Sequence, residues 1–254
     1  MRTDFSPGKA LRVLLAASLL AVAGAAMAED GDVDVDEPAY AGNPRDPYEG
    51  FNRAMFAVNE VLDKYAAKPV AQVYDNVTPL PVKAAFGNFF ANIGDLWIGV
   101  NGALQGKVGD AGSDLARILI NSTIGIFGLF DVASELGLER HDEDFGQTLA
   151  VWGVGDGGYV FLPLLGPRTL RDTAAWGVDY LADPLRSVEP ARLSNSVTAV
   201  RFADIRASLL PADKIVAEAA LDKYAYIRDA YLQRRRNQIY DGRPPRLDDD
   251  EDDD

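Results

Sequence analysis

Apolar residues recur at helical spacing along most of the chain, beginning in DPYEGFNRAMFAVNEVLDKYAAKP, residues 46–69. Its apolar residues lie three or four positions apart, as on one face of a helix: Phe51, Met55, Val58, Leu62 and Tyr65. Asp46 and Pro47 suit the N-cap and the first helical position. Pro69 disfavours helical geometry in the residue before it, so we predict that this helix ends at or before Lys68.

Two further stretches combine helical spacing with high hydrophobicity. In AAFGNFFANIGDLWIGVNGALQG, residues 84–106, one face of a helix would carry Phe89, Ile93, Trp97, Val100 and Leu104. Residues 118–130 contain 13 residues without a charge, which is too short to cross a bilayer. Two interpretations stay open here: these faces belong to an ordinary core, or they lie in the plane of a membrane with aromatic residues at its interface.

The next stretch changes character. In TLAVWGVGDGGYVFLPLLGP, residues 148–167, glycines interrupt the middle and β-favouring residues flank it, which predicts a short hairpin or an irregular loop. Helical spacing returns in residues 170–181, 194–210 and 212–242, and the last helix should end at Gly242. We therefore predict a mainly α fold in a single domain, residues 44–242.

The first 28 residues have the pattern of a secretory signal peptide. A basic start precedes an apolar run and the sequence Ala26-Met27-Ala28, the order that signal peptidase recognises. The apolar run is shorter than a bilayer-spanning helix. We expect cleavage after Ala28 and export, most simply into a bacterial periplasm.

The formal net charge of −14 is concentrated near the two ends. Residues 29–37, EDGDVDVDE, carry six acidic residues, and residues 248–254, DDDEDDD, carry seven. Such segments cannot build a core, so we predict a disordered acidic linker at 29–43 and a disordered acidic tail at 243–254. The remainder is nearly neutral, and its charge gives no reason to expect a nucleic-acid partner.

The sequence is poor in groups that carry out chemistry. It contains no cysteine and a single histidine, His141, and one histidine cannot complete a metal site without several carboxylates. GVGDGG, residues 153–158, matches a dinucleotide fingerprint, but Pro163 and Pro167 follow where a helix is required. We predict no enzyme activity, no catalytic residue, no metal and no cofactor.

A basic cluster, Arg234 to Arg236, lies near the end of the last predicted helix. One interpretation is that it compensates the helix dipole on a solvated face. The other is that it contacts anionic lipid headgroups or an acidic partner.

Three separated blocks resemble the MlaA (VacJ) family of the Gram-negative outer membrane. They are DPYEGFNRAMFAVNEVLDKY, DFGQTLAVWGVGDGGYVFLPLLGP followed by RTLRD, and YAYIRDAYLQRR. The resemblance implies a ring-like helical domain in the inner leaflet of the outer membrane, often beside a trimeric porin. It also implies retrograde transport, in which phospholipid leaves the outer leaflet through a polar channel and reaches a periplasmic carrier, so that lipid asymmetry is maintained.

With this resemblance, the apolar stretches become candidate membrane contacts. We expect seven residues to touch lipid: Phe89, Phe90, Ile93, Trp97, Ile124, Phe127 and Phe130. Four asparagines are candidates for the polar lumen: Asn88, Asn92, Asn101 and Asn121. A polar lumen would lower the cost of several kcal/mol that a headgroup meets in hydrocarbon.

The chain also departs from the family pattern. Members typically carry a lipobox cysteine at the cleavage site, and AAMAED, residues 25–30, has none; Ala150 and Gly158 also differ. We therefore expect apolar helical faces to hold the protein at the periplasmic face of the outer membrane. Two alternative functions remain: a soluble periplasmic lipid-binding carrier, and a porin-associated structural adaptor.

Overall fold

The computed structural model describes residues 43–245, and the chain from Arg45 onward forms one unit. The predicted signal peptide and nearly all of the two acidic segments lie outside the described residues. The unit is built mainly from helices, which confirms the predicted fold class. Its elements before the hairpin are α2 (Glu49–Leu62), the π-helix η1 (Asp63–Ala67), α3 (Lys68–Val77), α4 (Leu80–Leu104), α5 (Val108–Thr123), α6 (Val132–Glu135) and α7 (Phe145–Val151). The later elements are β1 (Tyr159–Leu162), β2 (Gly166–Thr169), α8 (Leu170–Ala182), the 3₁₀-helix η2 (Pro184–Ser187), α9 (Ala191–Ser208), α10 (Leu210–Ala219) and α11 (Lys223–Ile239).

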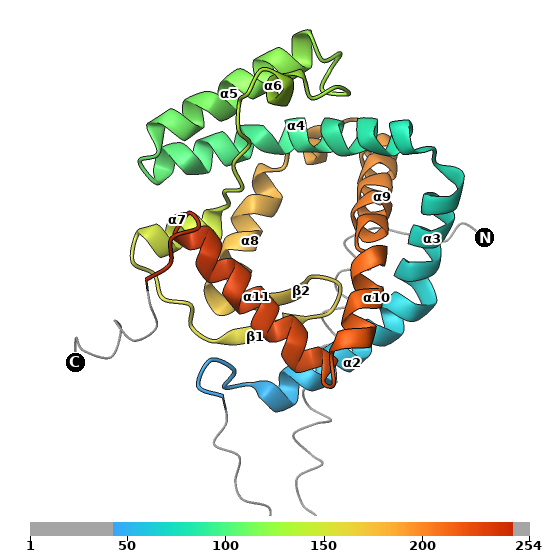
Figure 1. Ribbon diagram of the computed structural model, residues 1–254, viewed down its shortest axis with the longest axis vertical. Coiled ribbons are helices and arrows are strands. Elements are labelled where there is room, and N and C mark those ends of the chain that lie inside the picture. Colours follow the sequence, from blue (N-terminus) through green and yellow to red (C-terminus); the bar gives the residue numbers. More distant parts are fainter. Residues whose placement is uncertain (1–42, 246–254) are drawn as a thin grey trace, which may run out of the picture. The chain divides into compact units, whose positions relative to one another are not determined.

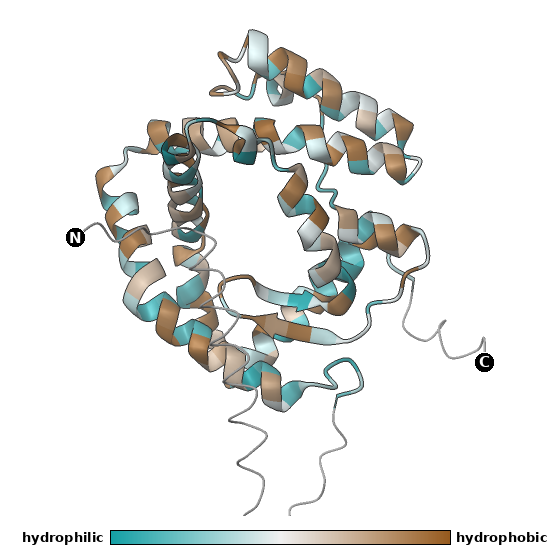
Figure 2. Cartoon of the chain, turned by 180° about the vertical axis from the view of Figure 1, so that it is seen from behind, coloured by the Kyte–Doolittle hydropathy of each residue, from teal (hydrophilic) through white to brown (hydrophobic). Residues whose placement is uncertain are grey.

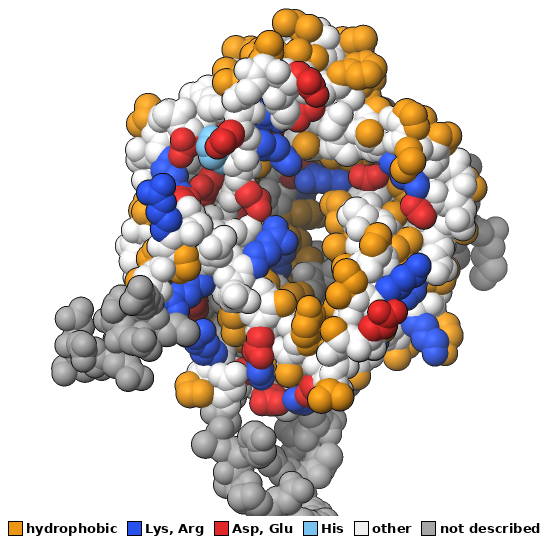
Figure 3. Space-filling model, viewed as in Figure 1, with side chains coloured by type: hydrophobic (Ala, Val, Ile, Leu, Met, Phe, Trp, Pro, Cys, Tyr) orange, Lys and Arg blue, Asp and Glu red, His pale blue; other side chains and the backbone are white. Residues whose placement is uncertain are grey.

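Helices α4, α8, α9, α10 and α11 surround a central hollow in this unit (Figures 1 and 3). Helix α4 runs along one side, and α5 packs outside it as the second arm of a helical hairpin. Small residues allow this close packing, since a Cβ at Gly102 would lie 3.6 Å from the Cβ of Ala111. The arrangement agrees with the ring-like domain that the resemblance implies.

The first helix differs from its prediction at both ends. Asp46 does not cap it: the residue preceding the helix is Tyr48, without a side-chain cap, and the Asp46 carboxylate instead accepts a hydrogen bond from Asn52 at 2.7 Å. Pro69 does not end the helical run either. The π-helix η1 leads into α3, where Pro69 stands in the first turn and its missing N–H needs no partner.

The predicted hairpin is present. Strands β1 and β2 pair antiparallel, with Tyr159 opposite Thr169 and Leu162 opposite Gly166. Tyr159 and Phe161 on β1 join Met55 and Tyr224 in a buried cluster between α2 and α11. The hairpin thus supplies the core that α11 covers.

Helix α11 is fastened at both of its ends by a buried arginine. Near its start, Arg228 lies 3.2 Å from Asp46, whose carboxylate also accepts a hydrogen bond from the Tyr224 hydroxyl. Near its end, Arg235 lies 2.6 Å from Asp144 and 2.8 Å from Asp172. Since Asp144 precedes α7 and Asp172 belongs to α8, these contacts join the C-terminal helix to the middle of the chain.

Gly146 makes room for the Arg235 ion pairs. A Cβ there would lie 2.4 Å from Arg235 Nη2 and 2.5 Å from Asp172 Oδ1, and both atoms are locked in a buried network. We predict that Gly146→Ala lowers the free energy of unfolding by ~3 kcal/mol, because the ion pair must be displaced. Thermal or guanidinium unfolding of the purified chain measures this loss.

Gly177→Ala is the matched control. Gly177 lies inside α8 and a Cβ there meets nothing within 4 Å, so alanine should raise the stability by ~0.5–1 kcal/mol through its helix propensity. Equal effects of the two substitutions would contradict the packing account of Gly146.

Candidate functional site

A cavity of 420 Å³ opens in the hollow that the helices surround. Figure 3 shows this hollow with charged side chains along its edge. Its lining comes from α4, the segment before α7, α8, η2 and α9. The lining residues are Gly87, Phe90, Ala91, Ile93, Gly94, Trp97, Ile98, Arg140, Asp144, Asp179, Asp183, Pro184, Arg201, Asp204 and Ile205.

The two sides of this cavity differ in chemistry. The α4 side contributes glycines, alanine and large apolar groups, among them Phe90, Ile93 and Trp97. The opposite side contributes carboxylates and guanidinium groups, among them Asp179 and Arg201. A molecule with an apolar part and a charged part would therefore find a matching surface for each.

Most of the charged lining groups already have a partner of opposite charge. Asp183 lies 2.8 Å from Arg201, and Arg140 lies 2.7 Å from the buried Asp95. Asp204 accepts a hydrogen bond from the Tyr74 hydroxyl at 2.8 Å. These contacts fix the charged side of the cavity on α8, α9 and the segment before α7.

Asp179, like Asp204, is held by neutral donors. Its Oδ1 accepts hydrogen bonds from Trp97 Nε1 at 2.7 Å and from the backbone N–H of Phe145 at 3.0 Å. Burial raises the pKa of Asp179 above its ordinary value, although these two hydrogen bonds and the charge of Arg168 act in the opposite direction. Carboxyl groups whose pKa is raised by burial cluster at functional sites.

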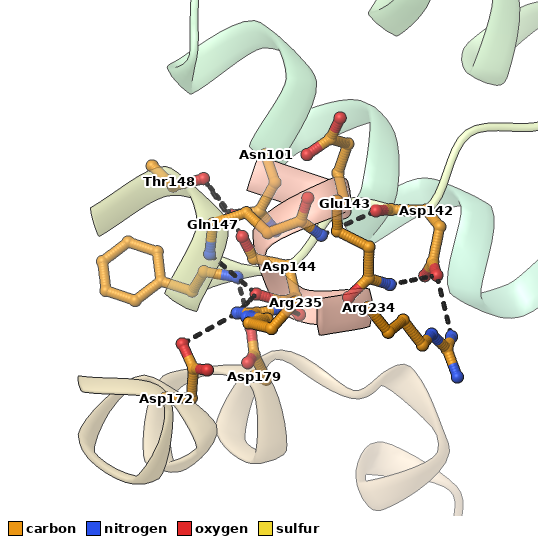
Figure 4. A network of polar contacts seen from close by, with 12 residues as sticks. Asn101, Asp142, Glu143, Asp144, Gln147, Thr148, Asp172, Asp179, Arg234 and Arg235 are labelled. Atoms are coloured by element: carbon orange, nitrogen blue, oxygen red, sulfur yellow. Dashed lines mark hydrogen bonds and ion pairs between the residues drawn. The ribbon is translucent and has the colours of Figure 1, made fainter. Parts of the chain in front are cut away.

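A second cavity of 230 Å³ adjoins the first and shares Asp144 and Asp179 with it. Figure 4 shows the ion pairs around it, in which Arg235 bridges Asp144 and Asp172. Burial acts to raise the pKa of Asp172, but the charge and hydrogen bonds of Arg235, together with Tyr231, outweigh burial and lower that pKa. The basic cluster is thus divided: Arg235 is buried, while Arg234 is exposed. Of these two residues, only Arg234 lies on a solvated face.

The seven expected lipid contacts form two groups. Ile124, Phe127 and Phe130 follow α5 together and are 65%, 76% and 58% exposed. The backbone at Ile126 and Phe127 is left-handed, with φ of 53° and 58°. This conformation is uncommon in residues other than glycine, and the side chains of both residues are exposed.

The other four expected lipid contacts lie on α4, where Phe89 is half-buried and its ring packs against that of Phe90. Phe90 is buried and, with Ile93 and Trp97, lines the cavity. Phe90 therefore faces the cavity and not the outer surface, because α4 has neighbours on more than one side. Contact of any of the seven with lipid stays a prediction.

None of the four asparagines is among the residues that line the two cavities. Asn88 and Asn92 bond to Leu129 O and Ser122 Oγ, and the Asn121 amide bonds to Asp131. Asn101 accepts a hydrogen bond from Thr148 Oγ1 at 2.8 Å. Asn88 and Asn92 join α4 to α5 and the loop after it, Asn101 joins α4 to α7, and Asn121 joins α5 to the residue before α6. A place for these asparagines in a polar lumen stays a prediction.

No local pattern in the sequence pointed to the charged residues that line the larger cavity. Asp179, Asp183 and Asp204 lie within ordinary amphipathic patterns, and only the tertiary fold brings them to one cavity. His141 contacts Asp114 at 3.1 Å and lies in the loop before α7. Among the described residues, no group of three or more metal-ligating side chains is suitably placed for an ion.

Comparison with known proteins supplies independent information. Residues 44–238 match the sequence model of a family described as "MlaA lipoprotein". The chain is 35% identical over 193 residues to the "Intermembrane phospholipid transport system lipoprotein MlaA" of Escherichia coli (strain K12), which covers 74% of this chain and 76% of the relative. It is 36% identical over 238 residues to an uncharacterized protein of Rickettsia bellii, which covers 90% of this chain and 93% of that one.

A solved structure is also similar to this chain. It was described under the heading "Structural basis for maintenance of bacterial outer membrane lipid asymmetry" and aligns with a TM-score of 0.66 at 34% identity. The alignment covers 78% of this chain and 99% of the solved chain.

The raised pKa of Asp179 yields a stability prediction with a definite sign. A carboxyl group whose pKa is raised by folding destabilises the fold when it is charged, and this cost disappears as the pH falls below the unfolded-state value of ~3.9. We predict that Asp179→Asn, which can retain an acceptor for Trp97, is at least as stable as the parent chain at pH 7. The advantage should shrink between pH 7 and pH 4 in thermal unfolding.

Asp172→Asn is the contrasting variant, because folding lowers the pKa of Asp172. Its carboxylate contributes stability above the unfolded-state pKa, and this stability is lost as the pH falls through the folded-state value. Asp172→Asn should therefore be destabilised at pH 7. A marked loss of stability at pH 7 in both variants would contradict the difference between the two sites.

Proposed function

The chain belongs to the MlaA family, and on this premise we propose that it carries out retrograde phospholipid transport. It removes phospholipid from the outer leaflet of the outer membrane and passes it by way of the central cavity to a periplasmic carrier. This transport maintains the lipid asymmetry of the membrane. The relatives in Escherichia coli and Shigella flexneri are named as parts of an intermembrane phospholipid transport system, which supports the proposal.

One observation carries the mechanism: the 420 Å³ cavity is apolar on its α4 side and charged on its α8 and α9 sides. Moving a headgroup through hydrocarbon costs several kcal/mol, because its charges lose their hydration. Charged and hydrogen-bonding groups such as Asp179 and Arg201 replace part of that hydration. The α4 side accommodates the apolar part of the lipid, so the barrier falls without any covalent step.

The outer surface supports a position in a membrane leaflet. Val70, Val73 and Val77 recur at helical spacing on α3, Leu80 follows at the start of α4, and all four are 53–78% exposed. Figure 2 shows hydrophobic residues along these outer helices. Among the described residues, no helix has both the length and the apolar character needed to span a membrane.

We assign membrane contact to these apolar surfaces, including Ile124, Phe127 and Phe130 after α5. The protein is exported and lies at the periplasmic face of the outer membrane, where a trimeric porin and a soluble lipid carrier are its partners. The two relatives are named lipoproteins. We assign the membrane attachment of this protein to its exposed apolar side chains, and the proposed transport needs no catalytic residue.

Ile124→Asp with Phe127→Asp tests the membrane contact. Both side chains are exposed, and aspartate tolerates the left-handed backbone at residue 127 better than most residues. We predict that the double variant folds but loses its association with phospholipid vesicles in a flotation assay, because charged side chains enter hydrocarbon only at high cost. Ile124→Leu with Phe127→Leu is the control and should float with the vesicles. Flotation of both pairs would reject this assignment.

Ala91→Trp tests transport through the cavity. Ala91 lines the cavity on α4, so an indole there should fill part of the passage. In the bacterium that encodes the chain, deletion of its gene should raise the amount of phospholipid in the outer leaflet. Expression of the Ala91→Trp variant in the deletion strain should fail to lower that amount again. Ala103→Trp, at an exposed position on the same helix, should reverse the rise fully.

These experiments also separate the alternatives. A soluble carrier would be recovered from the periplasm without membranes, and a structural adaptor would tolerate Ala91→Trp. Either result, obtained with a normally folded and normally abundant protein, would overturn the proposed passage.

A further inference from the structure

The smaller, 230 Å³ cavity is rich in charged residues, and most of them neutralise one another. Arg235 pairs with Asp144 and Asp172. Asp142 pairs with Arg234 at 3.3 Å and accepts a hydrogen bond from Gln238 at 2.7 Å. Two charged lining residues take no part in these pairs: Arg168 and Asp179.

Asp179 presents one free carboxylate oxygen. Both of its hydrogen bonds, from Trp97 and from the Phe145 backbone, reach the same atom, Oδ1. Among the described residues, Oδ2 accepts no hydrogen bond and no cation forms an ion pair with Asp179. The residue lines both cavities, so this oxygen is available at their junction.

Arg168 on β2 is the complementary group. Its Nε is buried without a hydrogen-bond partner, and within the described part of the chain its guanidinium forms no ion pair. Its aromatic neighbour is Trp176, whose ring centre lies 5.9 Å from the guanidinium carbon. Arg168 is close enough to Asp179 to lower the pKa of that carboxyl group, yet the two form no direct pair.

An unpaired cation and an unpaired anion that face one small cavity suit a ligand carrying both charges. We propose, building on the proposed phospholipid transport, that Arg168 binds the phosphate of a zwitterionic headgroup while Asp179 Oδ2 binds its primary ammonium. Guanidinium groups bind phosphate oxygens through several N–H donors, and an ammonium donates to a carboxylate in a charge-assisted hydrogen bond. The pair selects phospholipids of the phosphoethanolamine class over lipids with an anionic headgroup.

The selection follows from the two charges separately. Every phospholipid offers a phosphate to Arg168, so this contact does not discriminate between headgroups. Only an amine-bearing headgroup neutralises Asp179, whereas an anionic lipid leaves that carboxylate buried and unpaired beside further negative charge. Arg168 therefore sets the affinity for phospholipid in general, and Asp179 sets the preference among headgroups.

The test measures which lipid the full chain retains. Purified protein in detergent is mixed with equal amounts of phosphatidylethanolamine and phosphatidylglycerol of identical acyl chains, repurified, and analysed for bound lipid by mass spectrometry. The parent chain should be enriched in phosphatidylethanolamine. Asp179→Asn keeps an acceptor oxygen for Trp97 and Phe145, and it should lower the ratio of the two bound lipids about fivefold while still binding phospholipid.

Three further variants complete the test. Arg168→Gln should reduce the amount of both lipids, and Arg168→Lys should restore part of it, because lysine keeps the positive charge. Asp142→Asn is the matched control in the same cavity, where the carboxylate already has partners, and it should leave the ratio unchanged. Thermal unfolding of each variant shows that it folds.

The outcomes separate this inference from the proposed function. If the parent chain and Asp179→Asn bind both lipids in the same ratio, the headgroup site is wrong and phospholipid transport stands. If the parent chain retains no phospholipid at all, the proposed function itself is overturned. If soluble phosphoethanolamine binds the protein as tightly as phosphatidylethanolamine does, the assignment of the site to a lipid is overturned.

Discussion

The structure depends on the requirement that a buried charge be paired. Helix α11 carries two buried arginines seven residues apart, and each finds its carboxylates in a distant part of the chain. Arg228 reaches Asp46 before α2, and Arg235 reaches Asp144 and Asp172 beside α7 and in α8. The positions of α2, α7 and α8 around the hollow are thereby tied to one helix. Gly146 belongs to this constraint, because only a residue without a side chain leaves space for Arg235.

The same fold treats two neighbouring carboxylates in opposite ways. Asp172 is surrounded by Arg235, Tyr231 and Arg171, and folding lowers its pKa. Asp179, two helical turns further along α8, is half-buried with neutral donors, and this partial burial raises its pKa. The first arrangement stabilises the ring. The second costs stability, and such a cost is typical of residues that a ligand completes.

Local patterns in the sequence were sufficient for the mainly α class, the hairpin and the approximate limits of α4, α8 and α9, because periodicity and turn residues are local properties. They did not separate α10 from α11, which the sequence pattern joined into one helix. They could not assign the faces of α4. That helix packs against α5 and also lines the cavity, so its spacing of apolar residues does not separate Phe90, which is buried, from an outward-facing residue. The asparagines are ambiguous for a related reason: an amide between two helices and an amide facing a lumen have the same sequence pattern. Arg235 was hidden in a basic cluster, since its partners lie 91 and 63 residues away.

The hydrogen bond between Trp97 and Asp179 has a mechanical consequence. It ties α4 to α8 across the cavity and uses only one oxygen of the carboxylate. Ligand binding and helix spacing are therefore separable. A positively charged ligand group can bind the second carboxylate oxygen of Asp179 while the hydrogen bond to the first keeps α4 and α8 in contact. Moving α4 away from α8 at this point would require breaking the indole hydrogen bond, so one oxygen of Asp179 holds the two helices together while the other remains without a partner among the described residues.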